Sequence, residues 1–332
     1  MGPIKKKEFN YIERFSTKTK YKDDNFYNCG DSFLKATGFP GPIMGAINMF
    51  LGHTNTSKTT AMILAAVDAQ KKGHLPIFII TEKKWKWEHA VELGLEAEKD
   101  ENGEWYGNFI FNDSFDYIEQ ATDFINEILN EHEKGLIPQS ILFLWDSIGS
   151  IPCKMTYEGK GGKQHNAAAL ADKIGMGISS RVSKSKKEDY PTKEKSYYVT
   201  MVVINQPWVD IPDNPFGQPE IKAKGGEAVW LACSLVFLFG NQKKGGVNQI
   251  EATKNGRKVV FATRTKISVL KNHVNGLSYK DGKILAVHNG YIDDTKEALE
   301  EYKKLYSNYW NAQLSGTGEI LYNETEVLTS EE

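Results

Sequence analysis

The sequence predicts an α/β fold with a mainly parallel, twisted central sheet and helices on both of its faces. Three observations support this prediction. Short apolar runs alternate with amphipathic stretches as far as about residue 210, the order produced by parallel strands joined through helices. Beyond that point strands predominate. The composition, with 40% hydrophobic and 25% charged residues, is that of a folded globular protein.

The first elements can be assigned in order along the chain. Residues 1–30 are polar and irregular, with at most a short helix at Phe9–Phe15, and predict an arm rather than a domain. A strand at 47–51, a helix at 59–72 and a strand at 77–80 then form a βαβ unit, which joins parallel strands. Gly73 is suited to end the helix, because glycine readily adopts the left-handed conformation found there.

Further apolar runs and amphipathic stretches extend this pattern. The predicted strands are Ile141–Trp145, Val199–Asn205, Leu235–Phe239, Val259–Ala262 and Ile267–Leu270, and the predicted helices are Tyr117–Lys134 and Ala167–Lys184. Residues 294–312 predict an amphipathic helix that precedes an acidic tail. We therefore divide the chain into an arm (1–30), a core (31–293), and a C-terminal helix with its tail (294–332).

The net charge, the cysteine and histidine spacing and the lengths of the apolar runs exclude several classes of protein. The chain carries a formal charge of −2, and five glutamates in residues 313–332 contribute −5, which leaves +3 on the preceding part. A mildly basic body is compatible with nucleic-acid binding, although a solvated acidic end explains the tail equally well. The three cysteines and seven histidines lack metal-ligand spacing, so we expect a reducing interior and no zinc site. Without an apolar run of 18 residues or a signal sequence, we expect no membrane segment and a cytoplasmic location.

A polar loop joins the first predicted strand to the first predicted helix. It reads Gly52, His53, Thr54, Asn55, Thr56, Ser57, Lys58, Thr59 and Thr60. The phosphate-binding P-loop is G-x-x-x-x-G-K-[ST], and only Ser57 departs from it. In such a loop, backbone N–H groups surround phosphate oxygens, Lys58 reaches the β- and γ-phosphates and Thr59 ligates Mg²⁺. The loop therefore predicts a nucleotide site, in which the Cβ of Ser57 narrows the phosphate approach or strains the turn.

Two carboxylates end neighbouring predicted strands. Glu82 follows the run IFIIT, and Asp146 ends the run ILFLWD. Because ligands bind at the carboxyl ends of parallel strands, we expect both to converge on Lys58. Glu82 is then placed to polarise an attacking water, and Asp146 to hold Mg²⁺. The alternative for Asp146 is a residue that caps a turn at the strand end.

Several segments together resemble the RecA-type recombinases, including the phage UvsX branch, over residues 31–293. Asp146-Ser147 is followed by Pro152, Lys154, Glu158-Gly159 and Gly161-Gly162, which resembles the first DNA-binding loop of that family. Residues 205–226 resemble its second DNA loop through Asn205-Gln206, Phe216-Gly217, Pro219-Glu220 and Gly225-Gly226. Residues 263–273 resemble the strand that reaches the ATP of a neighbouring subunit.

The resemblance implies ATP-dependent assembly of a helical filament on single-stranded DNA, followed by homologous pairing and strand exchange with duplex DNA in recombination and repair. By resemblance Glu82 is the catalytic glutamate, Gln206 senses the γ-phosphate, and Lys271 with His273 reaches the neighbour's ATP. The same resemblance places Lys86 and His89 near the adenine. The DNA-binding residues it implies are Gly159, Lys160, Gly161, Gly162, Lys163, Trp208, Ile211, Phe216, Gly217, Lys222, Lys224, Gly225 and Gly226. Ile211 corresponds to the apolar side chain that enters between base triplets.

The chain departs from this family at several positions. Ser57 replaces glycine, His273 stands where lysine is usual, and Trp208 and Asp210 stand where basic residues are common. The glycines of both loops still offer bare backbone N–H groups to phosphates, a contact that reads no sequence. Possible further partners are single-strand-binding and loader proteins, in a bacterial cell or a phage-infected host.

Two segments allow more than one interpretation. Trp87 either stacks on the base or, like Trp85, belongs to the core or an interface. The basic residues at 181–190 are either a second DNA site or solvated surface.

Two other functions share the predicted fold. A hexameric helicase-type motor would need an N-terminal domain that 30 irregular residues do not supply. A filamentous DNA-protection protein that binds ATP without turnover would not need the full set of Lys58, Thr59, Glu82, Asp146 and Gln206.

Overall fold

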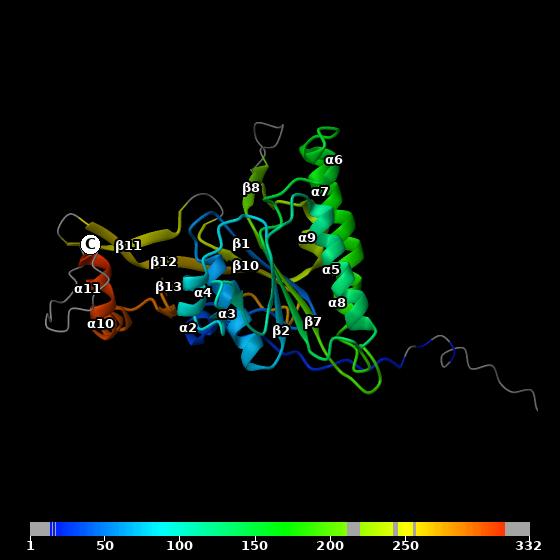
Figure 1. The fold of residues 1–332 in the computed structure, drawn as a ribbon, viewed down its shortest axis with the longest axis horizontal. Helices are drawn as coiled ribbons and strands as arrows, with labels where there is room; N and C mark the ends of the chain where they lie inside the picture. Colours follow the sequence, from blue (N-terminus) through cyan, green and yellow to red (C-terminus); the bar gives the residue numbers. More distant parts are fainter. Residues whose placement is uncertain are drawn as a thin grey trace, which may run out of the picture.

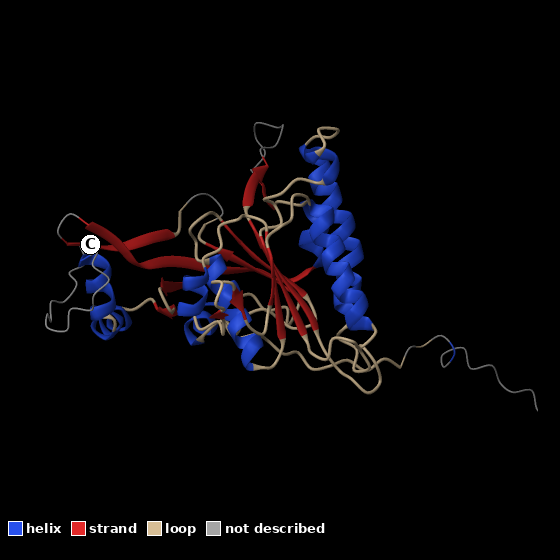
Figure 2. Cartoon of the chain, viewed as in Figure 1, coloured by secondary structure: helices blue, strands red, loops and turns tan. Residues whose placement is uncertain are grey.

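A ten-stranded sheet forms the centre of the protein (Figures 1 and 2). The computed structural model describes residues 14, 16, 18–210, 220–241, 245–254 and 257–315. The predicted helix at Phe9–Phe15, apart from Arg14, and the acidic tail beyond residue 315 lie outside the described residues. The spatial order of the strands is β14-β13-β12-β10-β1-β7-β6-β2-β5, and β11 pairs with β12.

One half of the sheet is parallel. Its strands, in spatial order, are β10 (Cys233–Phe239), β1 (Ile47–Gly52), β7 (Val199–Asn205), β6 (Ile141–Asp146), β2 (Leu75–Ile80) and β5 (Ile110–Asn112). All six residues of β1 are buried, as expected of a central strand with helices on both faces. The predicted α/β fold with a mainly parallel sheet is therefore confirmed.

The other half of the sheet is antiparallel. Its strands are β11 (Val247–Lys254), β12 (Arg257–Asn272), β13 (Gly282–Val287) and β14 (Gly290–Asp293). The prediction of two strands between residues 259 and 270 was wrong, because β12 runs through both without interruption. Its polar middle residues kept it from reading as one apolar run, yet it pairs in turn with β10, β11 and β13.

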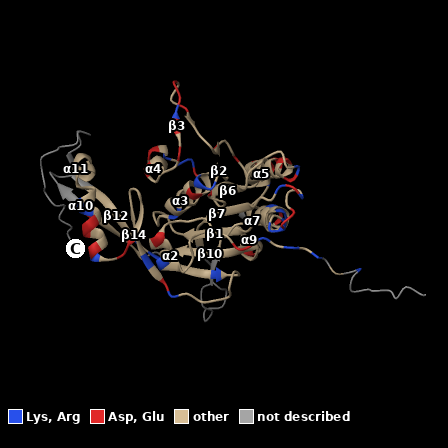
Figure 3. Ribbon diagram, turned by 90° about the horizontal axis from the view of Figure 1, so that it is seen from below, with Lys and Arg blue, Asp and Glu red and all other residues tan. Residues whose placement is uncertain are grey.

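Helices cover both faces of the sheet, and Figures 1 and 3 show the two layers. One face carries α2 (Asp31–Thr37), α3 (Lys58–Lys71) and α4 (Trp87–Glu92). The other carries α5 (Ile118–Glu133), α6 (Lys154–Tyr157), α7 (Lys163–Leu170), the π-helical segment η1 (Ala171–Ile178), α8 (Ser179–Lys184) and α9 (Gly226–Ala232). The predicted helix at 167–184 thus starts earlier and contains a π-helical segment.

Alternating side chains divide the core into two layers. Phe50, Phe78 and Leu144 point toward the α3 face, while Met49 and Phe143 point toward the α5 face. Each of these side chains is fully buried. Since successive residues of a strand face opposite sides, a strand covered on both faces reads as a continuous apolar run.

The C-terminal helices form a smaller third cluster on the antiparallel half. The single helix predicted at 294–312 is interrupted at Tyr306, which separates α10 (Lys296–Leu305) from α11 (Ser307–Ser315). Tyr302 and Trp310 of these helices pack against Phe261 and Val287 of the sheet. Each of the two helices therefore contributes an aromatic side chain to the same cluster.

Part of the predicted arm is attached to the core. Tyr27 and Cys29 are fully buried, and the Lys22 amino group donates hydrogen bonds to the carbonyl oxygens of Ser185 and Tyr197, both at 2.7 Å. Burial lowers the pKa of Lys22 to about 8. Residues 20–30 therefore pack as an extension of the core rather than as a separate element.

Two short hairpins extend from the sheet. β3 (Glu98–Lys99) pairs with β4 (Trp105–Tyr106), and β8 (Pro207–Asp210) pairs with β9 (Glu220–Ala223). The β3–β4 hairpin stands out from the body in Figure 3. Among the described residues, no helix is long and apolar enough to cross a membrane, no group of three or more His, Cys, Asp or Glu residues is arranged to hold a metal ion, and the three cysteines are free and buried.

Candidate active site

The polar loop between β1 and α3 lines a cavity of about 340 Å³ at the carboxyl ends of the parallel strands. Residues 54–59 form one side of this cavity. Gly52 and His53 are not among the residues that line this cavity. Gly52 packs closely against β10, where an added Cβ would lie 2.5 Å from Phe239 O, so this position requires glycine. Thr60 lines a neighbouring cavity of about 450 Å³.

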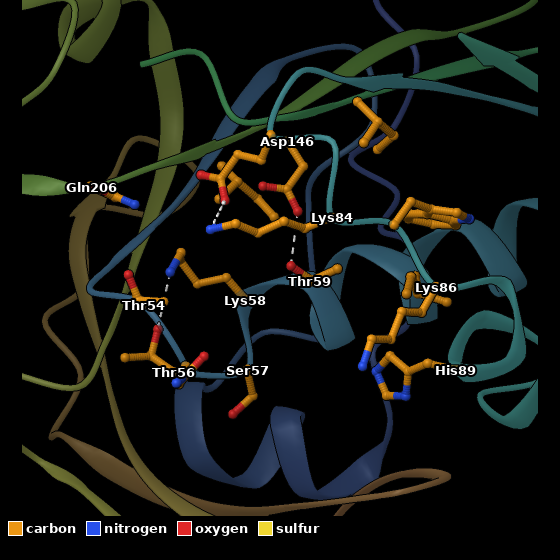
Figure 4. A pocket seen from close by; sticks show the side chains of 16 residues that line it. Thr54, Thr56, Ser57, Lys58, Thr59, Lys84, Lys86, His89, Asp146 and Gln206 are labelled. Atoms are coloured by element: carbon orange, nitrogen blue, oxygen red, sulfur yellow. Dashed lines mark hydrogen bonds and ion pairs between the residues drawn. The ribbon is translucent and has the colours of Figure 1, made fainter. Parts of the chain in front are cut away.

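Lys58 begins helix α3 and points into the cavity (Figure 4). Its Nζ donates hydrogen bonds to His53 O at 2.6 Å and to Thr56 Oγ1 at 3.2 Å. Burial lowers the pKa of Lys58 to about 8, although Asp146 and Glu82 act in the opposite direction. A buried ammonium group whose partners are neutral oxygens favours an incoming anion.

Thr59 and Asp146 meet on the other side of Lys58. Thr59 Oγ1 donates a hydrogen bond of 2.8 Å to Asp146 Oδ2, which Figure 4 draws as a dashed line. Burial raises the pKa of Asp146 to about 6, and the Thr59 bond partly offsets this. A hydroxyl and a carboxylate oxygen at this spacing are the hard donors that Mg²⁺ prefers, so this pair fits the metal.

Glu82 lies beside Asp146 because the backbone joins their strand ends. The amides of Thr81 and Glu82 both donate to Asp146 O, at 2.8 and 3.3 Å. Ser147 Oγ then donates to Glu82 Oε1 at 2.8 Å, and Lys84 Nζ lies 3.8 Å from Glu82 Oε2. The two carboxylates and Lys58 therefore occupy one cavity, with Glu82 oriented by a hydroxyl.

The other residues that line the cavity lie on two opposite sides of it. Gln206 lies on one side of the cavity in Figure 4, and Lys86 and His89 lie on the other. Burial lowers the pKa of His89, which favours its neutral form. Lys84 was missed from the sequence, although its place two residues after a strand-end carboxylate was an available signal.

The two tryptophans of this region take different positions. Trp85 lines the cavity and packs against Phe78, with ring centroids 4.9 Å apart. Trp87 does not line it and stacks on Trp105 of the β3–β4 hairpin, with centroids 5.4 Å apart and an interplanar angle of 19°. Of the two alternatives for Trp87, the structure favours an aromatic cluster over contact with the base.

Sequence comparison adds to this geometry. The chain is 26% identical to Protein RecA of Mesoplasma florum over 273 residues, or 81% of this chain and 70% of that protein. It is 25% identical to Protein RecA of Wolinella succinogenes over 72% of this chain and 58% of that protein, and 26% identical to that of Streptomyces coelicolor over 77% and 63%. These similarities support the RecA family. No model of a known protein family matches the chain. The chain spans about three fifths of the length of the RecA proteins of Wolinella succinogenes and Streptomyces coelicolor.

The glycine-rich segment that resembles the first DNA loop connects α6 to α7. Gly159 adopts a φ of 75°, and Lys160 Nζ forms an ion pair of 2.8 Å with Glu158. The amide of Gly162 donates to His165 Nδ1 at 3.0 Å. Gly161 lies against the same imidazole, and Lys163 begins α7. Figure 1 places this end of the helices at the same end of the molecule as β8.

The segment that resembles the second DNA loop starts and ends beside the cavity. Ile211, Phe216 and Gly217 lie outside the described residues. The backbone of Trp208 on β8 pairs in register with that of Lys222 on β9. Lys224 Nζ donates to Gln206 Oε1 at 3.2 Å, and Asn205 Nδ2 donates to Lys224 O at 2.7 Å. Gly225 and Gly226 follow with φ values of 91° and 76°.

Lys271 and His273 are not among the residues that line the cavity of their own protomer. Lys271 Nζ donates to Trp230 O at 2.8 Å and to Leu231 O at 2.9 Å, two carbonyls in the last turn of α9. His273 is exposed, and its amide donates to Ser234 O at 3.0 Å. Lys271 thus lies near the C-terminal end of β12, and His273 follows that strand.

The basic segment 181–190 has partners within the chain. Arg181 Nε pairs with Glu133 Oε1 at 2.9 Å, and its Nη1 donates to Asn126 Oδ1 at 2.9 Å. Lys186 pairs with Asp24 at 3.2 Å. Structural roles therefore account for these two charges.

Proposed function

We propose that this chain is an ATP-dependent recombinase, which assembles as a helical filament on single-stranded DNA and exchanges strands with homologous duplex DNA. The similarity to RecA proteins supports the broader class of DNA-dependent ATPase. The cavity supports the same assignment, because it holds an anion-binding lysine, a pair of oxygens suited to Mg²⁺ and an oriented carboxylate.

Each residue has a separate role in hydrolysis. Lys58 and the first N–H groups of α3 hold the β- and γ-phosphates. Thr59 and Asp146 would hold Mg²⁺, which would neutralise charge on the phosphates. Glu82 accepts a proton from the attacking water, and the hydroxyl of Ser147 fixes its orientation.

The observation that carries this proposal is the contact between Gln206 and Lys224. Gln206 lines the cavity, and its Oε1 accepts a hydrogen bond from Lys224 at the base of the second loop. A γ-phosphate that attracts the Gln206 side chain would release Lys224 toward DNA. A generic ATPase needs no such connection between its phosphate site and a glycine-flanked loop.

The partners follow from the same proposal. Copies of the chain form the filament, in which Lys271 and His273 of one protomer reach the ATP of the next. The arm (1–30), core (31–293) and C-terminal part (294–332) then serve assembly, chemistry and surface charge respectively. We place the protein in the cytoplasm of a bacterial or phage-infected cell, with the phage branch and loader proteins as the finer part of the proposal.

The decisive experiment measures ATP hydrolysis with and without single-stranded DNA. We expect DNA to stimulate hydrolysis, and electron microscopy to show helical filaments whose length follows that of the DNA. Rings would instead support a hexameric motor. ATP-dependent filaments without phosphate release would support a DNA-protection protein.

A further inference from the structure

Ser57 is the position at which the phosphate loop departs from its consensus, and its backbone explains why glycine is usual there. Ser57 has φ 65° and ψ 20°, in the left-handed region that L-residues seldom adopt. A side chain that persists in this conformation needs compensating contacts. Figure 4 shows the Ser57 side chain pointing away from Lys58, Thr59 and Asp146, so it does not face the catalytic groups.

Two strands of the antiparallel half supply such contacts. Ser57 Oγ lies 3.1 Å from Oγ1 of Thr265, a fully buried residue of β12. The hydroxyl of Tyr291 on β14 donates to Ser57 O at 2.6 Å. The same carbonyl accepts the Ala61 amide at 3.3 Å in the first turn of α3. We call these two side-chain hydrogen bonds the Ser57 contacts.

The side-chain groups that form the Ser57 contacts keep their proton and their position. Burial raises the pKa of Tyr291 well above its ordinary value, so its hydroxyl remains a donor at neutral pH. Thr265 is held in the sheet on both sides, opposite Val247 of β11 and Ile284 of β13. Because the rotamers of a buried threonine on a central strand are few, its hydroxyl occupies a fixed place.

The loop is packed closely against a third element as well. The Cβ that Gly240 lacks would lie 3.4 Å from Thr56 Cγ2, and Gly240 donates its amide to Lys266 O at 2.7 Å. The residue after Thr265 is thus tied to the turn that packs on the loop. Strand β12 then continues without interruption to Lys271.

We propose that the Ser57 contacts position the phosphate loop, so that β12 and β14 set how tightly the loop binds the phosphates of a nucleoside triphosphate. Ser57, Thr265 and Tyr291 are positioning residues, since their hydroxyls act on the loop and not on the reacting atoms. The inference rests on the proposed nucleotide site and assigns a role to the side chain that replaces glycine. It also gives β12 a direct connection from the loop to Lys271.

The test is a double-mutant cycle that measures affinity for Mg²⁺ and ATP by calorimetry on the full chain. Ser57→Ala and Thr265→Val each remove the same hydrogen bond, and we expect each to weaken binding about three- to tenfold. The double variant should be no weaker than either single variant, because the shared bond can be lost only once. Tyr291→Phe should weaken binding by a similar factor, and Thr265→Ser should restore it.

Two further variants separate positioning from general stability. Thr200→Val removes a buried hydroxyl at the amino end of β7, which accepts the Gly45 amide at 3.0 Å, and should leave ATP affinity unchanged. Ser57→Gly removes the hydroxyl together with the strained Cβ. If Ser57→Gly binds ATP more tightly than the wild type while Thr265→Val binds equally, the hydroxyl has no positioning role and the inference is wrong.

The outcomes distinguish this inference from the proposed function. Failure of the wild-type protein to bind ATP would overturn the nucleotide site itself. Tight wild-type binding with unchanged affinity in Thr265→Val, Tyr291→Phe and Ser57→Ala would overturn only the Ser57 contacts. Thermal unfolding of each variant without nucleotide shows whether it is folded, and Ser57→Ala and Tyr291→Phe decide the question even if Thr265→Val unfolds.

Discussion

The parallel and antiparallel halves of the central sheet contact the phosphate loop in different ways. Strands β1, β2 and β6 end at the cavity and present groups suited to chemistry, namely Lys58 after β1, Glu82 after β2 and Asp146 on β6. Strands β12 and β14 present Thr265 and Tyr291, whose hydroxyls form hydrogen bonds with the side chain and the carbonyl oxygen of Ser57 respectively. The difference teaches that, where Ser57 replaces the second glycine of the P-loop pattern, side chains from distant strands contact the loop.

This comparison predicts that variants of the two halves fail differently. Loss of a group from the parallel half should abolish chemistry in each protomer. Loss of a group from the antiparallel half should change loop position or communication between protomers, while the chemical groups stay in place.

The largest effect is expected for Glu82→Gln. Since the amide cannot accept a proton from water, we expect a loss of about 10²- to 10⁴-fold in ATP hydrolysis, with ATP binding retained. Glu88→Gln is the matched control, because Glu88 is an exposed glutamate on α4 whose carboxylate lies 3.8 Å from Lys99. Near wild-type phosphate release by Glu82→Gln would show that Glu82 is not the base.

The second-largest loss of ATP hydrolysis is expected for a variant of the antiparallel half. Lys271→Ala should lower DNA-stimulated hydrolysis by about 10²-fold or more, because a cation offered to the neighbouring γ-phosphate stabilises the transition state. Lys280→Ala, an exposed lysine near β12, is the control. Phosphate release from filaments measures the effect.

Mixing experiments sharpen this prediction. Combining Lys271→Ala with Glu82→Gln protomers should restore some hydrolysis, since the second variant offers an intact Lys271 to the first. Lys271 also donates to two carbonyls in the last turn of α9, and denaturation of the isolated variant measures that structural contribution separately. Wild-type turnover by pure Lys271→Ala filaments would mean that each subunit works alone.

A smaller effect is expected in the second loop. Replacing Lys222 and Lys224 together with alanine should weaken single-stranded DNA binding regardless of sequence. Each lost phosphate contact lowers the slope of log affinity against log salt by about 0.7. Titrations of labelled DNA at several salt concentrations measure this slope, and an unchanged slope would remove both lysines from the DNA path.

The smallest effect concerns stability and pH. The pKa of Asp146 rises from 3.8 to about 6 in the folded protein. Between these two pH values the folded state therefore holds a proton that the unfolded state has released. The resulting stabilisation is complete below pH 4 and is lost as the pH rises through 6. Asp146→Asn should therefore be more stable than the wild type by about 1–3 kcal/mol at pH 7–8, and nearly equal at pH 4.

Chemical denaturation in metal-free buffer at these pH values measures the difference. Asp172→Asn is the control, because Asp172 is an exposed carboxylate paired with Lys173 at 3.4 Å. Equal differences in the free energy of unfolding at pH 4 and pH 8 would contradict the raised pKa.

The parallel half was predictable because its signals are local. A central strand covered on both faces is a continuous apolar run, and the elements β1, α3, β2 and β6 all appeared near their predicted places. The motif around Lys58 and the strand-end carboxylates are local as well. The rule that ligands gather at the carboxyl ends of parallel strands was then enough to bring Glu82 and Asp146 to Lys58.

The antiparallel half depended on information that no local pattern contains. Ser57 and Thr265 are 208 residues apart, and Ser57 and Tyr291 are 234 apart. Their contacts follow from the register of β12 and β14 within the sheet, which is specified by pairing across many strands. From its sequence alone, Ser57 indicated only a strained departure from the motif. Tertiary structure decided that its hydroxyl and carbonyl have fixed partners, because only the assembled sheet places two distant hydroxyls beside the loop.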